Sequence, residues 1–174
     1  MKLTSPAFRD GNPIPERFTA FGAEISPPMT WSGVPSDAKC LVLTCVDLDA
    51  PQRPFIHWVV YNIPAQWRGL PEDLPFIEAP LDGVRQAFND YRTPGWAAPF
   101  PPPGRTHEYH FRLLALDCKI NEQHGYDHCD VYTALQGHVL DEAELIGTYV
   151  RKDSEVPPMP ASDRWGQRRV VVTN

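Results

Sequence analysis

Proline is the residue that most constrains the fold of this chain. It accounts for 20 of the 174 residues, against a typical share of about 5%, and it recurs throughout the first 103 residues and again from Pro157. A proline inside a helix removes a backbone hydrogen bond and clashes with the preceding turn, so long helices are excluded over most of the chain. We therefore expect a mainly β fold in which short strands are joined by stiff loops.

The composition predicts a single globular domain. A length of 174 residues lies within the usual range of about 100–200 residues for one domain. The net charge of −6 and the lack of a basic run argue against nucleic-acid binding. No stretch approaches the roughly 18 apolar residues of a membrane span, and the first residues lack the apolar segment of a signal peptide.

The cysteines predict reduced thiols and a cytoplasmic protein. Cys40, Cys45, Cys118 and Cys129 have no CxxC spacing. Cys40 and Cys45 lie five residues apart in one predicted strand, and an odd offset places them on opposite faces.

Three short apolar segments predict buried strands at residues 38–49, 56–64 and 107–117. In the last of these, the odd-numbered residues from His107 to Ala115 share one face. These strands argue for a β-sandwich or a barrel-like domain.

Residues 131–151 are the one segment with a convincing helical pattern, because Val131, Leu135 and Val139 are spaced by four. Asp127 or Asp130 is expected to cap its start, and Gly137 to divide it into two short helices. The last seven residues, 168–174, predict a final strand.

Polar residues stand where the predicted strands begin and end. Asp47 and Asp49 close the first segment, His57 opens the second, and His107 and Tyr109 open the third. If the strands pair, these side chains converge at one end of the sheet, beneath a long proline-rich loop. A simpler interpretation stays open, in which the aspartates cap a turn and His57 is a core residue with its hydrogen bonds satisfied.

Three chemistries fit such a cluster. Two histidines and a carboxylate match a facial metal triad, although the tight local spacing of a strong metal motif is missing. Carboxylates with a histidine can catalyse hydrolysis, yet the chain has neither a G-x-S-x-G turn nor a glycine-rich phosphate loop. Histidine and tyrosine can also donate to phosphate oxygens while the aspartates orient His57 or accept from an ammonium or hydroxyl group.

Four segments resemble the phosphatidylethanolamine-binding protein family, in the bacterial branch often called Raf-kinase-inhibitor-like. They are ISPPMTWSGVP from Ile25, DLDAP…HW from Asp47, APFPPPGRTHEYHFRLLAL from Ala98 and GHVLDEAELIGTY from Gly137. Their order and spacing match over residues 1–150. Each segment alone is a weak signal, whereas the four together are specific.

The resemblance implies a Greek-key β-sandwich with a large central antiparallel sheet, a smaller second sheet and short peripheral helices. It covers a domain at 1–150 and leaves 151–174 as a C-terminal extension that packs on the domain or on a partner, a homodimer being one option. It also implies an anion-binding pocket at one end of the central sheet. The expected ligand-binding residues are Asp47, Asp49, Phe55, His57, Pro101, His107 and Tyr109.

The implied function is a non-enzymatic module that binds a phosphate-bearing small molecule or phospholipid head group and regulates a partner kinase or protease. No cofactor and no metal are expected. The alternative is a hydrolase that acts on a phosphoester through Asp49 and His57. Leu48 and Phe55 replace a proline and a common tryptophan of the family, and so mark where the ligand preference is expected to differ.

Three further residues carry weaker expectations. Gly104 matches a loop glycine of the family, for which a positive φ would explain the residue. Glu108 replaces the usual arginine and should point away from the pocket, because it alternates with His107. His124 and His128 have the spacing of two metal ligands on a helix, but we interpret them as surface residues ahead of a helix.

Overall fold

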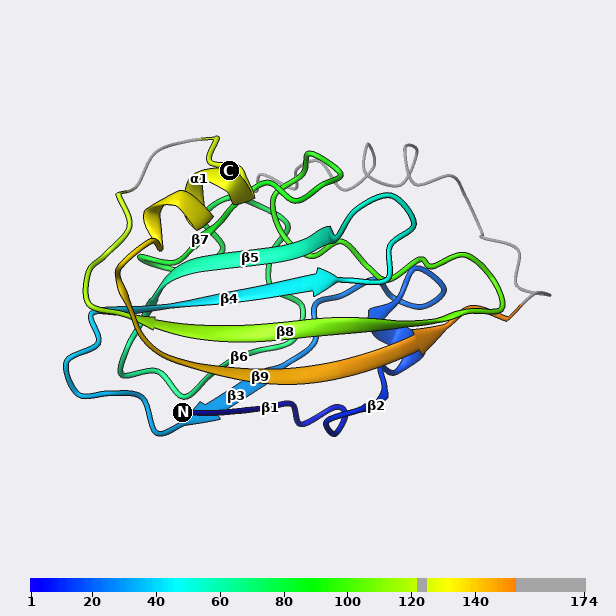
Figure 1. Cartoon of the computed structure of the whole chain (residues 1–174), viewed down its shortest axis with the longest axis horizontal. Coiled ribbons are helices and arrows are strands. Elements are labelled where there is room, and N and C mark those ends of the chain that lie inside the picture. Colours follow the sequence, from blue (N-terminus) through cyan, green and yellow to red (C-terminus); the bar gives the residue numbers. More distant parts are fainter. Residues whose placement is uncertain (122–124, 153–174) are drawn as a thin grey trace, which may run out of the picture.

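The chain folds mainly into β-strands arranged in two sheets, and the computed structural model describes residues 1–121 and 125–152 (Figure 1). The six-stranded central sheet has the order β2-β9-β8-β4-β5-β7, and the three-stranded sheet has the order β1-β3-β6. The central strands are β2 (Asn12–Pro13), β4 (Cys40–Asp47), β5 (Phe55–Pro64), β7 (Arg85–Gln86), β8 (Thr106–Leu116) and β9 (Val139–Val150). The other elements are β1 (Lys2–Thr4), β3 (Met29–Ser32), β6 (Gly69–Leu70), the 3-10 helix η1 (Glu16–Phe18) and the helix α1 (His128–Ala134).

The central sheet has Greek-key topology. Within this sheet β4, β5 and β7 follow one another as neighbours, and after a long connection β8 returns to lie beside β4. Its strand pairs are antiparallel except for a short parallel pairing of β2 with β9. The predicted two-sheet, mainly β sandwich is therefore confirmed. No helix among the described residues is long and apolar enough to cross a membrane.

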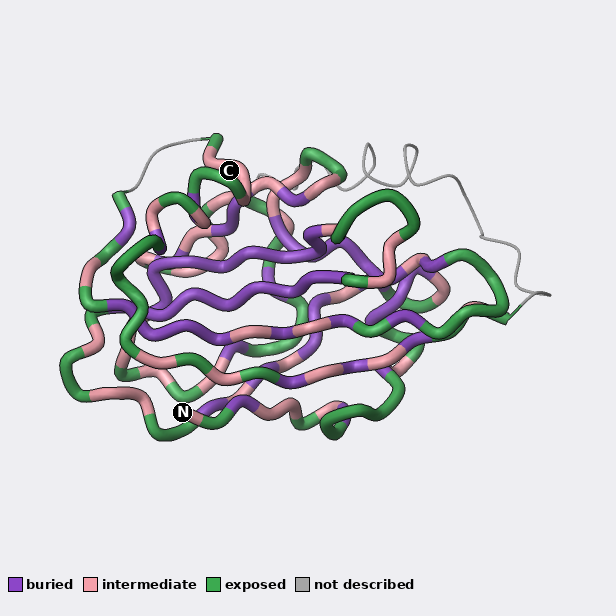
Figure 2. Tube along the Cα trace, in the orientation of Figure 1, coloured by how far each residue is buried: buried purple, intermediate pink, exposed green. Residues whose placement is uncertain are grey.

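The neighbouring strands β4 and β5 are buried on both faces (Figure 2). One face packs against the small sheet through a cluster that includes Cys45 and Trp58, and the other packs against α1 through a cluster that includes Cys40 and Val59. Cys40 and Cys45 thus face opposite sides, as predicted, and all four cysteines are free thiols. Burial of apolar surface stabilises the folded state by about 25 cal/mol per Å². Because β4 and β5 are buried on both faces, they hold the side chains at their ends in fixed positions.

The prediction of a helical zone at residues 131–151 is wrong for most of its length. Only its start lies in α1, whose N-cap is Asp127, one of the two predicted capping residues. Gly137 then adopts a φ of 79°, which glycine reaches at little cost. From Val139 onward the chain pairs with β8 as β9, so tertiary pairing outweighs local helix propensity. The strand predicted at 168–174 lies outside the described residues.

Candidate functional site

The polar residues singled out in the sequence meet at one end of the central sheet. Asp47, the last residue of β4, pairs with Phe55 of β5 on one side and with Tyr109 of β8 on the other. His57 and His107 lie close to the same end of β5 and β8. The side chains of Asp47, His57, His107 and Tyr109 are all buried. We call these four residues the buried cluster.

A β-bulge turns His57 into the buried cluster. Cys45 pairs with Trp58 and the next residue, Val46, pairs with Ile56, so His57 is an extra residue in β5. Successive residues of a regular strand face opposite sides, but here the rings of His57 and Trp58 both lie near Trp96, at centroid distances of 6.2 and 5.6 Å. Bulges redirect side chains in this way.

His57 is held in its neutral form. Its Nδ1–H donates to the Ala97 carbonyl at 2.6 Å, and the Ala97 amide donates to the His57 carbonyl at 2.8 Å. Burial lowers the pKa of His57 to about 4, against the opposing influence of the Ala97 carbonyl and the Asp47 charge. At neutral pH its Nε2 is therefore a hydrogen-bond acceptor. The hypothesis that the aspartates orient His57 is wrong, because the Ala97 carbonyl does so.

Asp47 instead orients His107. Its Oδ2 accepts from Nδ1 of His107 at 2.7 Å, and its Oδ1 accepts from the Asp49 amide at 2.9 Å. Asp47 thus caps a turn, as the simpler interpretation predicted, and also fixes the ring of a second buried residue.

Two polar atoms of the buried cluster have no hydrogen-bond partner: Nε2 of His107 and the hydroxyl of Tyr109. Burial, reinforced by the negative charge of Asp47, raises the pKa of Tyr109 far above its ordinary value, so the phenol keeps its proton and can donate it. A buried polar group without a partner costs about 1–3 kcal/mol. Native proteins rarely leave such groups unpaired, and a ligand that reached both atoms would remove that cost.

Asp49, which was expected to line the pocket, holds the connector after β4 against β8. Its carboxylate accepts from the Glu108 amide at 2.9 Å and lies 3.4 Å from the Arg105 guanidinium. Glu108 itself is exposed, whereas its neighbour His107 is buried, which agrees with the expectation that Glu108 points away from the pocket. Pro101 is the buried residue of its proline run, and Gly104 has a φ of 77°, as expected for this glycine.

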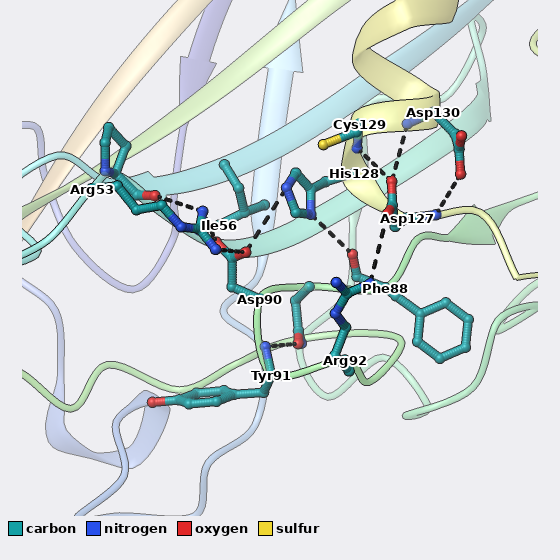
Figure 3. A network of polar contacts seen from close by, with 12 residues as sticks. Arg53, Ile56, Phe88, Asp90, Tyr91, Arg92, Asp127, His128, Cys129 and Asp130 are labelled. Carbon is teal, nitrogen blue, oxygen red and sulfur yellow. Dashed lines mark hydrogen bonds and ion pairs between the residues drawn. The ribbon is translucent and has the colours of Figure 1, made fainter.

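A polar network around Asp90 lies beside the start of β5, next to the buried cluster, and Figure 3 shows the network itself. The Phe55 ring lies 4.8 Å from His57 and 4.8 Å from Tyr91. The carboxylate of Asp90 accepts from the Ile56 amide at 2.7 Å and from Arg53 at 2.6 Å. Asp90 therefore fixes the backbone at Ile56, directly before His57. No sequence pattern links this loop residue to β5, so its role was not predicted.

Of the two histidines with the spacing of metal ligands, His124 and His128, the structure describes only His128. His128 begins α1, where its Nε2 lies 3.9 Å from the Asp90 carboxylate. His124 lies outside the described residues.

Comparisons with known proteins agree with this fold. The sequence model of the phosphatidylethanolamine-binding protein family matches residues 4–150. A UPF0098 protein of Methanothermobacter thermautotrophicus is 47% identical over 151 residues, covering 87% of this chain and 99% of the relative. A UPF0098 protein of Aquifex aeolicus is 39% identical over 153 residues, covering 87% and 89%.

Two solved structures are similar as well. CT736 of Chlamydia trachomatis, described as a homologue of the phosphatidylethanolamine-binding proteins, aligns with a TM-score of 0.79 and 35% identity over 87% of this chain and 97% of its own. YbcL of E. coli, described as a new member of the mammalian family, aligns with a TM-score of 0.80 and 30% identity over 87% and 98%. The chain belongs to the phosphatidylethanolamine-binding protein family.

Proposed function

We propose that the buried cluster binds a phosphate-bearing small molecule or a phospholipid head group without turning it over. The observation that carries the proposal is the pair of unpartnered polar atoms, His107 Nε2 and Tyr109 Oη. Tyr109 donates a hydrogen bond in its protonated form, and His107 donates from Nε2 when both ring nitrogens carry protons. Two such donors suit the oxygens of a phosphate group.

The neutral His57 adds selectivity to this proposal. Its Nδ1 proton is engaged by Ala97, so Nε2 can accept from a hydroxyl or ammonium group of the same ligand. A phosphate ester with such a group nearby, for example phosphoethanolamine, would match the donors and the acceptor together. Inorganic phosphate would match only the donors.

The hydrogen bonds of the two aspartates favour binding over the alternative of phosphoester hydrolysis. Both Asp47 oxygens accept hydrogen bonds, and Asp49 contacts Arg105 and the Glu108 amide rather than His57. Burial raises the pKa of the nearby Cys45 thiol well above its ordinary value, which disfavours the thiolate nucleophile. Regulation of a partner kinase or protease by the liganded protein is a further part of the proposal and rests on the family alone.

Titration with phosphate and with phosphoethanolamine, followed by thermal unfolding, tests the proposal. A ligand at 100 times its Kd adds about 2.7 kcal/mol to the free energy of unfolding. Tyr109→Phe removes one unpartnered atom with little change in shape, and should weaken this stabilisation while the free protein stays folded. Tyr132→Phe, on the α1 side of the sheet, is the matched control.

Two outcomes would count against this function. Equal stabilisation of the parent chain and Tyr109→Phe would show that the ligand does not use the buried cluster. Turnover of a phosphoester that disappears in Asp49→Asn would favour the hydrolase instead.

A further inference from the structure

A second group of polar side chains lies at the opposite end of β8 from the buried cluster. Asp117 and Cys118 directly follow β8, and His138 directly precedes β9. A carboxylate oxygen, the Cys118 Sγ and an imidazole nitrogen lie within 4.8 Å of one another. At about 3.3 Å per residue along a strand, this group is roughly 30 Å from His107. We call it the distal triad.

The central sheet holds the distal triad together. The Asp117 amide donates to the His138 carbonyl at 3.1 Å, and their neighbours Leu116 and Val139 are paired across β8 and β9. The thiol of Cys40 donates to the carbonyl of Cys118 at 3.1 Å. Both segments are thus fixed by the fold, so no rearrangement of the backbone is needed to bring the three donors together.

We propose that Asp117, Cys118 and His138 bind a divalent transition-metal ion of the Zn²⁺ class. A thiolate and an imidazole select Zn²⁺ or Co²⁺ over Mg²⁺ and Ca²⁺, which prefer oxygen donors only. Three protein ligands leave a fourth tetrahedral position for water or another small ligand. The site is independent of the proposed phosphate site.

The spacing of the donors is close to what such an ion requires. Bonds of about 2.0–2.3 Å in a tetrahedron put the ligand atoms about 3.3–3.8 Å apart. Asp117 Oδ1 and His138 Nδ1 are now 2.8 Å apart, in a hydrogen bond, and their side chains are 48% and 47% exposed. Metal binding would displace the proton that these two atoms share and would release the Cys118 thiol proton to solvent. The exposed side chains of Asp117 and His138 can rotate by the small amount needed.

Titration of the reduced, untagged full chain with Co²⁺ provides the direct test. We expect one equivalent of Co²⁺ to produce the near-ultraviolet absorption of a cobalt–thiolate bond and the visible bands of tetrahedral cobalt, and Zn²⁺ to displace it. Cys118→Ser should abolish the thiolate band. His138→Gln should weaken Zn²⁺ binding, measured by calorimetry, by at least the roughly tenfold that loss of even an indirect partner costs.

Two matched variants separate this site from other donors. Cys129→Ser removes the exposed thiol of α1, and His124→Gln removes a histidine outside the described residues; neither should change Co²⁺ or Zn²⁺ binding. Circular dichroism of Cys118→Ser and His138→Gln should match that of the parent chain, so that lost binding reports the ligand and not the fold.

Three results would overturn the proposal. The first is the absence of a cobalt–thiolate band in the parent chain. The second is a band that survives Cys118→Ser, and the third is Zn²⁺ binding that depends on His124 but not on His138. Phosphate-induced stabilisation, measured in the same variants, should be unchanged, so failure of the metal site is distinguishable from failure of the phosphate site.

Discussion

Two aspartate–histidine pairs lie at opposite ends of β8 with nearly the same geometry. Asp47 Oδ2 and His107 Nδ1 are 2.7 Å apart, with side chains 6% and 1% exposed, whereas Asp117 Oδ1 and His138 Nδ1 are 2.8 Å apart, with side chains 48% and 47% exposed. Water screens the exposed pair, so it contributes little to stability. Removing one partner of a buried pair costs much more. Burial, and not distance, therefore sets what each pair contributes.

The largest effect is expected from Asp47→Asn. This change removes the buried carboxylate that accepts a hydrogen bond from His107. We expect the free energy of unfolding to fall by about 3 kcal/mol. Urea unfolding at pH 7 measures this loss. A loss below about 1 kcal/mol would mean that the buried pair behaves like an exposed one.

His57 sharpens the comparison, because it is a buried histidine oriented by a carbonyl instead of a carboxylate. Its folded pKa of about 4 lies below the ordinary value of about 6.5. Well above pH 6.5 the ring is neutral in both states. As the pH falls through 6.5, the unfolded chain takes up a proton that the folded chain does not. Stability should therefore decrease by about 2 kcal/mol between pH 7 and pH 5 from this group.

Comparison with His57→Gln isolates this contribution, since the carboxylates titrate in both proteins. The variant should lose less stability than the parent chain between pH 7 and pH 5 in urea unfolding. Identical pH dependence in the two proteins would contradict a neutral, buried His57.

The smallest effect is expected from Asp117→Asn without metal. In the presence of a chelator, the free energy of unfolding should change by less than about 1 kcal/mol, measured under the same conditions as Asp47→Asn. An equal loss of stability in Asp117→Asn and Asp47→Asn would contradict the conclusion that burial sets the contribution of each aspartate–histidine pair.

The strands that carry their own sequence pattern were predictable, and β9 was not. β4, β5 and β8 each contain a run of buried residues bounded by turns. Among the residues of β9 only Leu145, Gly147 and Tyr149 are buried, and its glutamates and leucines favour a helix as readily as a strand. Its pairing with β8 decides the outcome, and no local pattern contains that pairing.

For the candidate site, the sequence predicted that the four residues of the buried cluster would meet, but not how they would be oriented. It also placed Asp49 with them, whereas Asp49 contacts Arg105 and the Glu108 amide. Pairing of the predicted strands was enough to bring Asp47 next to Tyr109. The partner of His57 is a backbone carbonyl of the proline-rich loop, and the loop residue Asp90 supports the same stretch. Where a long loop returns to a sheet depends on the whole fold, so neither contact had a sequence signal.

The extra residue at His57 also changes how β5 has to be counted. Ile56 faces α1 before the bulge, whereas the odd-numbered Val59 and Tyr61 face α1 after it, so the alternation of side chains shifts by one residue at His57. Deletion of Ile56 would remove this shift and set His57 opposite Val46, on the far side of the sheet from Tyr109. A family member shortened by that one residue would keep every side chain of the buried cluster in its sequence and still be unable to assemble it.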